Sequence, residues 1–278
     1  MRESFWQKLL KFYLPLALFI LFLLFPFYWM FNTSLKPMRE LYNLKLNPLY
    51  IHTPTLANVK TLLFDTIFFR WMFNTFFVAI LSTAISLSTS LLAAYAIQRL
   101  KFKTSGPTGL FIFFGYLIPP TILFIPLATI IFDLKLWDSL WSLVLVYPTF
   151  LIPFCTWLLM GYFKSIPKEM EECAMIDGAS RLRVFWRIVI PLSLPGIFSA
   201  GIFAFTLSWN EFLYALAFIS TTESKTAPIG LVTELVRGDL YHWGPLMTGA
   251  LLASVPVALV YSFFVEHYVA GLTGALKE

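Results

Sequence analysis

The sequence is poor in charge: Asp, Glu, Lys and Arg make up 13% of its 278 residues. A soluble domain usually carries charge on about a quarter of its residues. Hydrophobic residues make up 59% of the chain, and the mean hydropathy is +0.77. The scarcity of charge excludes an ordinary soluble domain. It predicts an all-α membrane protein that meets the lipid bilayer over most of its surface.

Metal ligands and thiols are also scarce, with three histidines and two cysteines. Cys155 lies in an apolar run and Cys173 in a charged segment, so we expect neither a disulfide nor a metal site. No GxxxxGK[ST] loop occurs, and we therefore expect ATP to be bound by a partner and no cofactor by this chain. The net charge of +5 is spread over short basic clusters between apolar runs, which does not indicate nucleic acid.

Six apolar runs are long enough to cross a bilayer, and the first is too long for a signal peptide. They are Leu9–Phe31, Met72–Ile97, Leu110–Phe132, Leu140–Phe163, Ile197–Ile219 and Leu246–Tyr268. An even number of spans places both termini on one side. Basic residues gather near Lys8, Arg99 and Lys164, so the positive-inside rule predicts that both termini are cytoplasmic. Residues 1–278 are expected to form a single transmembrane domain.

The longest inside-facing loop, residues 164–195, has the pattern of two short helices. Pro167 suits a first helical turn, and acidic residues such as Glu172 follow at the positive end of that helix. Gly178 is placed to end the helix in a left-handed conformation. Ser180 can cap a second helix, Arg181–Ile190, that ends at Pro191.

The second helix is predicted to be amphipathic. One face carries apolar side chains, and Arg183 and Arg187 share another face at i, i+4 spacing. The apolar residues are Leu182, Phe185, Trp186 and Val189. An amphipathic hairpin at the membrane interface would explain this pattern without any partner.

Residues in this loop also match a known motif. The segments 172–174, 177–179 and 188–191 resemble the EAA loop of binding-protein-dependent ABC import permeases, whose pattern is Glu-Ala-Ala, three residues, Gly, nine residues and Ile-x-Leu-Pro. The matching residues are Glu172, Ala174, Gly178, Ile188 and Pro191. The sequence departs from the pattern at Cys173 and Ile190, where the substitutes are compact or apolar. We call residues 164–195 the EAA-like loop.

Further motifs resemble the carbohydrate-uptake branch of this family, specifically its maltose-permease-like second subunit. They are Trp209-Asn210-Glu211-Phe212, Ala227-Pro228, Trp243-Gly244 and residues 271–275. The resemblance implies a type I ABC importer permease fold and no enzymatic activity in this chain. It also implies a second permease subunit, two cytoplasmic ATPase subunits that hold ATP and Mg, an extracytoplasmic binding protein and a carbohydrate substrate. Relatives that move a polyol or glycerol phosphate are the alternative.

The resemblance assigns the EAA-like loop to a cleft of an ATPase subunit. Glu172 would meet a basic group there, Ala174 would permit close approach, and Gly178 would set the bend. Cys173, Asp177, Ala179 and Pro191 complete the motif. Arg183 and Arg187 could face the ATPase or anionic lipid head groups.

An ionisable group inside a span is expensive and seldom faces lipid, so Glu211 is a candidate for the solute path. Asn210, Thr206, Tyr214 and, more weakly, Asn74 accompany it. The cluster could line the path of a hydroxyl-rich solute or form hydrogen bonds between helices. A membrane-embedded enzyme would need convergent catalytic groups, and a secondary carrier usually shows inverted repeats. Both remain remote alternatives.

Overall fold

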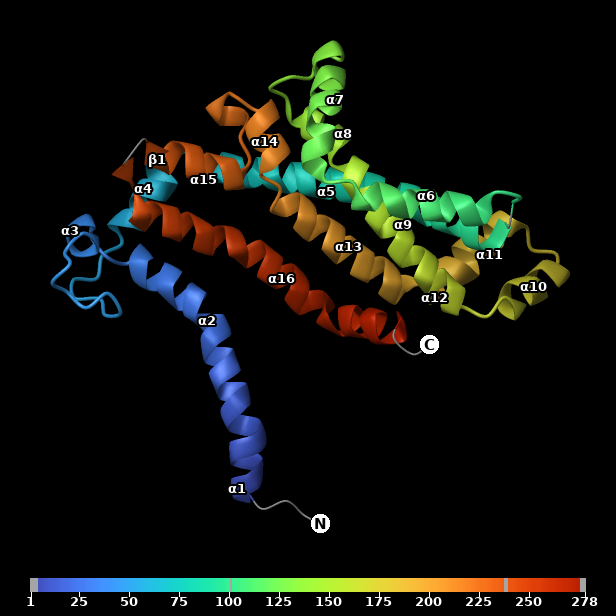
Figure 1. The fold of residues 1–278 in the computed structure, drawn as a ribbon, viewed down its shortest axis with the longest axis horizontal. Coiled ribbons are helices and arrows are strands. Elements are labelled where there is room, and N and C mark those ends of the chain that lie inside the picture. The colour runs from blue at the N-terminus through green and yellow to red at the C-terminus, as the bar shows by residue number, and fades with distance from the viewer. Residues whose placement is uncertain (1–4, 101, 238–239, 276–278) are drawn as a thin grey trace. The chain divides into compact units, whose positions relative to one another are not determined.

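The computed structural model describes residues 5–100, 102–237 and 240–275. These residues form helices joined by loops, with a single pair of two-residue strands among them (Figure 1). The chain divides into two compact units, one from residues 1–69 and 230–255 and the other from residues 70–229 and 256–278. The predicted all-α class is confirmed.

The first unit begins with a long apolar helix. Pro15 lies in the first turn of α2, where a missing N–H costs little, and Pro26 lies inside the helix. Short helices and an antiparallel strand pair follow. The elements are α1 (Phe5–Lys8), the π-helical η1 (Leu9–Tyr13), α2 (Leu14–Ser34), α3 (Met38–Leu41), α4 (Ala57–Phe64), β1 (Val236–Arg237), β2 (Leu240–Tyr241) and α16 (Trp243–Ala275), which continues into the second unit.

A buried carboxylate organises the loop after α2. Glu40 accepts hydrogen bonds from the backbone amides of His52 (2.9 Å) and Thr53 (3.0 Å) and from the Thr53 hydroxyl (2.9 Å), and its Oε1 lies 3.2 Å from His52 Nδ1. Burial alone would raise the pKa of Glu40, but these hydrogen bonds outweigh it and lower the pKa to about 2. The loop is therefore a folded element that depends on an ionised Glu40.

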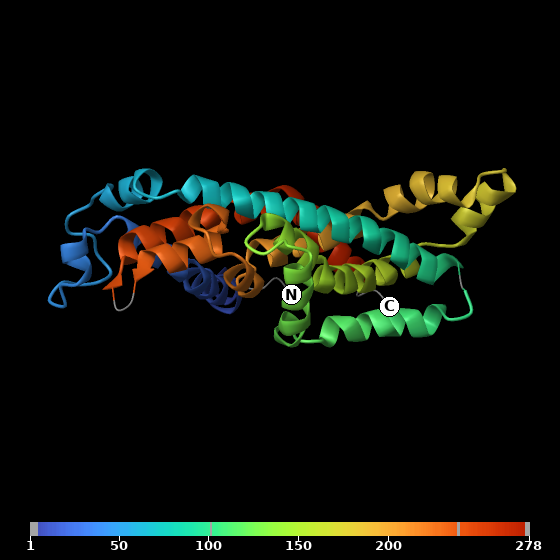
Figure 2. The same cartoon turned by 90° about the horizontal axis from the view of Figure 1, so that it is seen from above.

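The second unit contains the other helices. In order, they are α5 (Phe68–Tyr95), η2 (Ala96–Leu100), α6 (Ser105–Leu117), α7 (Pro120–Asp133), α8 (Leu140–Val146), α9 (Pro148–Ser165), α10 (Glu169–Ile176), α11 (Arg181–Val184), η3 (Phe185–Val189), α12 (Ile190–Leu192), α13 (Leu194–Trp209), α14 (Leu213–Phe218), η4 (Thr222–Ser224) and α15 (Ala227–Leu235), which continues into the first unit from residue 230. Within this unit α9 runs between α5 and α6 (Figure 2).

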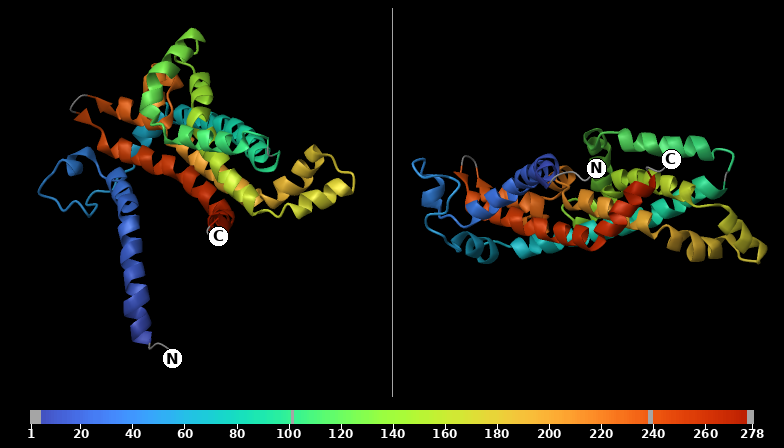
Figure 3. Two further views of the ribbon diagram at one scale, coloured as in Figure 1. Left: turned by 45° about the vertical axis from the view of Figure 1, so that its right-hand side comes forward. Right: turned by 90° about the horizontal axis from the view of Figure 1, so that it is seen from below.

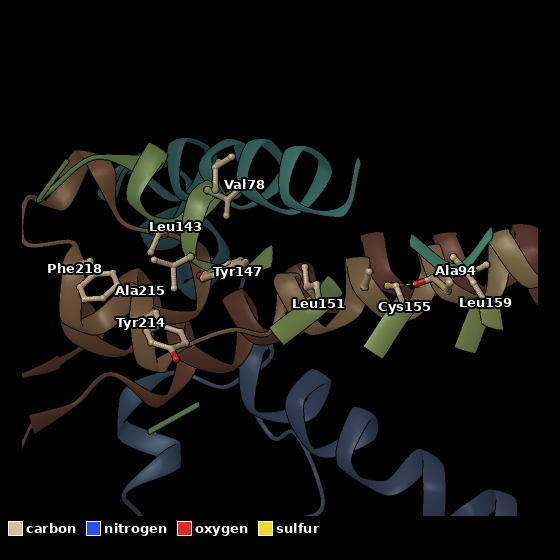
Figure 4. Close-up of a cluster of buried hydrophobic side chains, with 14 of the residues drawn as sticks. Val78, Ala94, Leu143, Tyr147, Leu151, Cys155, Leu159, Tyr214, Ala215 and Phe218 are labelled. Atoms are coloured by element: carbon tan, nitrogen blue, oxygen red, sulfur yellow. Dashed lines mark hydrogen bonds between the residues drawn. The ribbon is translucent and has the colours of Figure 1, made fainter. Parts of the chain in front are cut away.

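The core of the second unit is apolar, and small polar side chains within it form hydrogen bonds between helices. Leu143, Tyr147, Leu151 and other side chains of α8 and α9 pack with residues of α5, α13 and α14 (Figure 4). The Ser82 and Ser208 hydroxyl groups are 2.9 Å apart and connect α5 to α13. Small residues allow helices of a membrane protein to approach closely, and these buried hydroxyls are satisfied by neighbouring helices.

Four of the six predicted spans are unbroken, and the third and fifth are interrupted. Among the described residues, four helical stretches are long and apolar enough to cross a membrane without a break: Leu9–Ser34, Phe68–Leu100, Leu140–Ser165 and Trp243–Val265. The third span bends by 95° between α6 and α7, at the Pro119-Pro120 pair. Each of these prolines lacks the backbone N–H that a continuous helix would need, which accounts for the break.

The fifth span, expected over Ile197–Ile219, is not one helix. A preceding helical stretch, Arg181–Leu192, joins α13 at a 75° bend, and α13 then ends at Trp209 before α14 begins at Leu213. The physical reason lies in Glu211, whose carboxylate oxygens accept the amide hydrogens of Tyr214 (2.9 Å) and Ala215 (3.1 Å). A side chain that satisfies these amides starts a new helix in place of continuing the old one.

Candidate functional site

The EAA-like loop forms two helical segments at one end of the second unit (Figures 1 and 3). The first segment is α10, with its three glutamates in the first turn. Gly178 has φ +86°, the left-handed conformation predicted for it. Ser180 accepts a hydrogen bond from the Arg183 amide (3.4 Å) and begins the second segment. That segment continues through η3 and α12 to Leu192, one residue beyond Pro191.

A buried ion pair fastens this loop to η2, which continues α5. Arg99 Nε lies 2.7 Å from Glu171 Oε1, and these side chains are 5% and 7% exposed. Arg99 also donates to the Ile166 carbonyl (2.7 Å), and the Tyr95 hydroxyl donates to Glu171 Oε2 (3.4 Å). Removing one partner of such a pair leaves an uncompensated buried charge. The pair therefore fixes where α10 sits against the unit.

Sequence reasoning missed Glu171 and chose its neighbour Glu172. The available signal was helical spacing. Glu171 lies three residues before Ala174, and both occupy the inward face of α10, whereas Glu172 is exposed. An acidic residue on the same face as a predicted packing residue needs a buried cationic partner, and Arg99 lies at the end of the second span.

The outward surface of the EAA-like loop combines charge with apolar side chains. The motif residues Glu172, Cys173, Asp177, Gly178, Arg183, Arg187 and Pro191 are exposed, while Ala174 and Ala179 pack against the core. The predicted apolar face of the second segment is half wrong. Phe185 and Val189 are buried, but Leu182 (65% exposed) and Trp186 (60% exposed) point outward. Val184, the last residue of α11, takes an inward position instead.

Side chains at the start of α5 hold the loop that contains η4. Asn74 donates to the carbonyls of Glu223 and Lys225, both at 2.8 Å. Trp71 Nε1 donates to Thr222 O (2.9 Å), and the Thr75 hydroxyl accepts from the Ala227 amide (2.8 Å). Asn74 therefore fastens this loop, and its amide hydrogens are engaged there.

The same loop is also tied at its beginning. Asp138 Oδ1 accepts from the amides of Ser220 (2.8 Å) and Thr221 (3.0 Å), and the Asp138 amide donates to Phe218 O (2.9 Å). Burial would raise the pKa of Asp138, but these hydrogen bonds lower it. The segment from Ser220 to Ala227 is therefore held at both ends by side-chain hydrogen bonds.

The other candidates for the solute path cluster at the α13–α14 break. Asn210 Nδ2 donates to Thr206 O (2.9 Å), and Thr206 donates to Ile202 O (2.7 Å). The Tyr214 hydroxyl donates to Pro120 O (2.6 Å) and connects α14 to α7. The structure brings Thr206, Asn210, Glu211 and Tyr214 together, each with a structural hydrogen bond, and gives Asn74 other partners.

The comparison with protein families agrees with this arrangement. Residues 86–274, which include the EAA-like loop and both breaks, match the family described as "binding-protein-dependent transport system inner membrane component". The chain belongs to this family. It is a multi-pass component of the inner membrane and the permease subunit of an ABC importer.

Similar permeases cover nearly the full length of the chain. The sulfoquinovosyl glycerol transport system permease protein SmoH of Agrobacterium fabrum is 40% identical over 91% of this chain and 89% of its own. The trehalose/maltose transport system permease protein MalG of Thermococcus litoralis is 32% identical over 100% of this chain and 99% of its own.

A solved structure shares the fold. It belongs to a bacterial ABC transporter involved in the import of the acidic polysaccharide alginate, and it matches with a TM-score of 0.82 at 20% identity. The match covers 96% of this chain and 99% of that chain. The predicted importer permease fold is confirmed.

Proposed function

We propose that this permease moves a sugar or oligosaccharide that an extracytoplasmic binding protein delivers. The support is the cargo in the names of its relatives, which includes sulfoquinovosyl glycerol, trehalose and maltose. A polyol or glycerol phosphate is the second candidate. In either case the importer needs a second permease subunit, and ATP and Mg belong to two ATPase subunits and not to this chain.

The EAA-like loop is the proposed contact with an ATPase subunit. The observation that carries this proposal is the division of α10 into two faces. Glu171 on one face is buried against Arg99, while Glu172 on the other is exposed. Exposed apolar side chains, among them Ile176 (84% exposed), Leu182 and Trp186, surround these charges. An interface of this kind has apolar anchors with charges at its rim.

In this proposal the ion pair transmits movement. When ATP binding closes the ATPase subunits, α10 moves with them, and the Arg99–Glu171 contact pulls the end of α5 along. The spans then rotate as rigid bodies between inward-facing and outward-facing states. Glu172 contacts the ATPase, and Arg99 and Glu171 position α10 for that contact.

The test is the ATPase activity of the complete importer in lipid nanodiscs, with and without binding protein loaded with candidate sugars. Glu172→Ala and Gly178→Asp should weaken ATPase association and abolish stimulation. Truncating an interface anchor costs about 2 kcal/mol, or roughly 30-fold in affinity. Glu169→Ala is the matched control, since Glu169 is exposed on the same helix but lies outside the motif.

The possible outcomes distinguish the proposed contact with the ATPase from the proposed identity of the solute. Stimulation by one sugar in the wild type, lost in both loop variants but kept in Glu169→Ala, supports both parts and names the sugar class. Stimulation by a polyol or glycerol phosphate alone replaces the sugar proposal and leaves the coupling proposal intact. Normal stimulation in Glu172→Ala and Gly178→Asp would refute the coupling role.

The assignment of Asn210, Glu211, Thr206, Tyr214 and Asn74 to the solute path stays a prediction. Glu211→Gln keeps the shape of the side chain and one acceptor oxygen for the α14 amides, and it removes the charge. Because the NH2 group of Gln cannot accept the second α14 amide, a lower melting temperature is expected in either case. If Glu211 contacts the solute, uptake should change with the sugar tested, whereas an equal loss for every sugar would indicate a purely structural role.

A further inference from the structure

A pocket of about 180 Å³ lies in the first unit, between the last turns of α2 and the loop that follows α3 (Figure 1). At roughly 30 Å³ each, about six water molecules would fill it. The pocket therefore has room for one small ring and not for a chain of rings. We call this space the α2–α3 pocket.

Hydrogen bonds hold the walls of the α2–α3 pocket in place. The Lys36 side chain is 4% exposed and donates to Pro48 O (2.5 Å), which ties the end of the loop to the residues after α2. The Oδ1 atoms of Asn43 and Asn47 accept from the backbone amides two residues ahead, at 3.1 and 2.9 Å. Asparagine commonly makes this bond in a tight turn. Both asparagine side chains are therefore oriented by the backbone before a ligand arrives.

The lining combines one aromatic wall with several hydrogen-bond donors. Trp29 lines the pocket and is 37% exposed, so its ring is accessible. Because Oδ1 is engaged in Asn43 and Asn47, each side chain offers a ligand its NH2 group, which carries two donors. The hydroxyl group of Thr33 adds a donor that can also accept. Binding sites for small molecules usually pair apolar or aromatic walls with a few oriented polar groups of this kind.

The charges of the pocket favour a neutral ligand. Two charged residues line it, Lys36 and Glu40, and they attract each other electrostatically. The Glu40 carboxylate is also held by the hydrogen bonds that it accepts from His52 and Thr53. An ionic ligand would disturb this balance, whereas a neutral ligand rich in oxygen atoms would match the donors. An apolar molecule would leave those donors unmatched, and a small open-chain polyol would leave the Trp29 ring uncovered.

We propose that the α2–α3 pocket binds one ring of a neutral sugar. The C–H groups on one face of the sugar ring lie against Trp29. The oxygen atoms at its edge accept hydrogen bonds from Thr33, Asn43 and Asn47. The inference rests on the proposed sugar import for the source of this ring, which is the solute itself. By the predicted topology the loop after α2 is extracytoplasmic, so the site would hold the solute on the side from which it is imported.

The test is photoaffinity labelling of the permease–ATPase complex in lipid nanodiscs, without binding protein and without ATP. The probes are photoreactive diazirine derivatives of glucose, galactose and mannose. At least one probe should label residues 29–48, as mapped by peptide mass spectrometry, and the same sugar without the diazirine should compete with it. Glycerol has hydroxyl groups but no ring, and cyclohexanol has a ring but one hydroxyl group. Neither should compete.

Three variants locate the site. Trp29→Leu removes the aromatic wall, and Asn43→Ser with Asn47→Ser removes the NH2 groups while serine still accepts the amide two residues ahead. Each hydrogen bond contributes roughly a factor of five, so the double serine variant should raise the sugar concentration needed for competition roughly 25-fold. Thr33→Val keeps the size of the side chain and should raise it roughly five-fold.

Two controls separate the loss of the site from the loss of the loop. Tyr50→Leu is matched to Trp29→Leu, because Tyr50 is exposed in the same loop and is not among the residues that line the pocket. It should be labelled like the wild type. Hydrogen exchange of residues 38–53 shows whether the loop is intact in the double serine variant, and Thr33→Val tests the site from α2 without altering the loop.

The remaining outcomes would overturn the inference. Labelling spread evenly over the chain, or an equal loss in Tyr50→Leu and Trp29→Leu, would show nonspecific adsorption. Equal competition by glycerol would identify a site for any polyol. If sugars stimulate the ATPase but none labels residues 29–48, this inference is wrong and the proposed function stands. If a sugar labels residues 29–48 but no sugar stimulates the ATPase, the pocket binds sugar and the proposed function is wrong.

Discussion

At the residue scale, neighbouring glutamates in α10 have opposite environments. Glu171 is buried against Arg99, and Glu172 is exposed one residue later. The difference follows from the helix, because successive side chains point about 100° apart around its axis. A carboxylate on the inward face must be paired, and one on the outward face is free to meet another protein.

Breaking the Arg99–Glu171 pair from one side should be more harmful than replacing both partners. Arg99→Met leaves Glu171 buried and unpaired, which costs about 3–5 kcal/mol, and Glu171→Leu does the same to Arg99. The double variant should lose less than the sum of the single variants. Thermal melting of the purified complex, combined in a double-mutant cycle, measures this coupling. Additive losses would show that the two side chains stabilise the fold independently.

Acid should loosen the loop between α2 and α4. The folded pKa of Glu40 lies near 2 and its ordinary value is 4.5, so the stabilisation is complete above about pH 4.5 and is lost as the pH falls toward 2. Hydrogen exchange of residues 38–53, compared between pH 6 and pH 3, should show this loss in the wild type. In Glu40→Gln, residues 38–53 should exchange their amide hydrogens faster than in the wild type already at pH 6. Lowering the pH to 3 should add little to this difference. Unchanged protection down to pH 2.5 in the wild type would contradict the role of Glu40.

Sequence reasoning was reliable for residues whose role is local. The left-handed Gly178 and the Ser180 cap are decided by their nearest neighbours in the chain, and both are confirmed. The Arg99–Glu171 pair joins residues 72 positions apart, and its existence depends on how α10 packs against η2. Helical spacing marks Glu171 as inward-facing, but no local pattern identifies Arg99 as its partner.

At the scale of elements, hydropathy located the spans and failed at their interruptions. The run Ile197–Ile219 is apolar enough to predict one span in spite of Asn210 and Glu211, whereas the break depends on hydrogen bonds that the Glu211 carboxylate accepts. The bend of the third span was foreseeable from Pro119 and Pro120, since proline removes a backbone donor. Polar and proline residues inside an apolar run are thus where a helix prediction needs most care.

The packing of α9 against α13 depends on a glycine. A Cβ built on Gly196 would lie 2.5 Å from Cγ of Tyr162, inside van der Waals contact. Gly196→Leu should therefore force these helices apart and cost about 1–3 kcal/mol, as overpacking does. The drop in melting temperature should be partly reversed by adding Tyr162→Ala. Gly161→Ala, with no atom within 4 Å of its Cβ, is the matched control. If Tyr162→Ala does not raise the melting temperature of the Gly196→Leu variant, then crowding between residue 196 and Tyr162 is not the cause of its instability.

At the scale of the whole molecule, the orientation in the membrane is still a prediction from the positive-inside rule. The two cysteines offer a direct check, because Cys155 is buried and Cys173 is exposed on the EAA-like loop. A membrane-impermeant maleimide should label Cys173 in inside-out vesicles and not in right-side-out vesicles or spheroplasts. The ATPase subunits should protect it from labelling. Labelling of Cys173 from the outside would reverse the topology and remove the basis for the coupling proposal.

Helix α5 continues into η2 as a helical stretch of 33 residues, Phe68–Leu100, or about 50 Å. Near one end of this stretch, Trp71, Asn74 and Thr75 form hydrogen bonds with segment 222–227. At the other end, Arg99 forms the ion pair with Glu171 of α10. A continuous helix that is bonded at both ends can transmit a tilt from one end to the other. Under the proposed function, a loaded binding protein that presses on segment 222–227 would tilt α5 and η2 as one body. The Arg99–Glu171 contact would then move at the same time, with no chain of side-chain rearrangements between the two ends. In this way α5 and η2 could report the arrival of a loaded binding protein without contacting the solute.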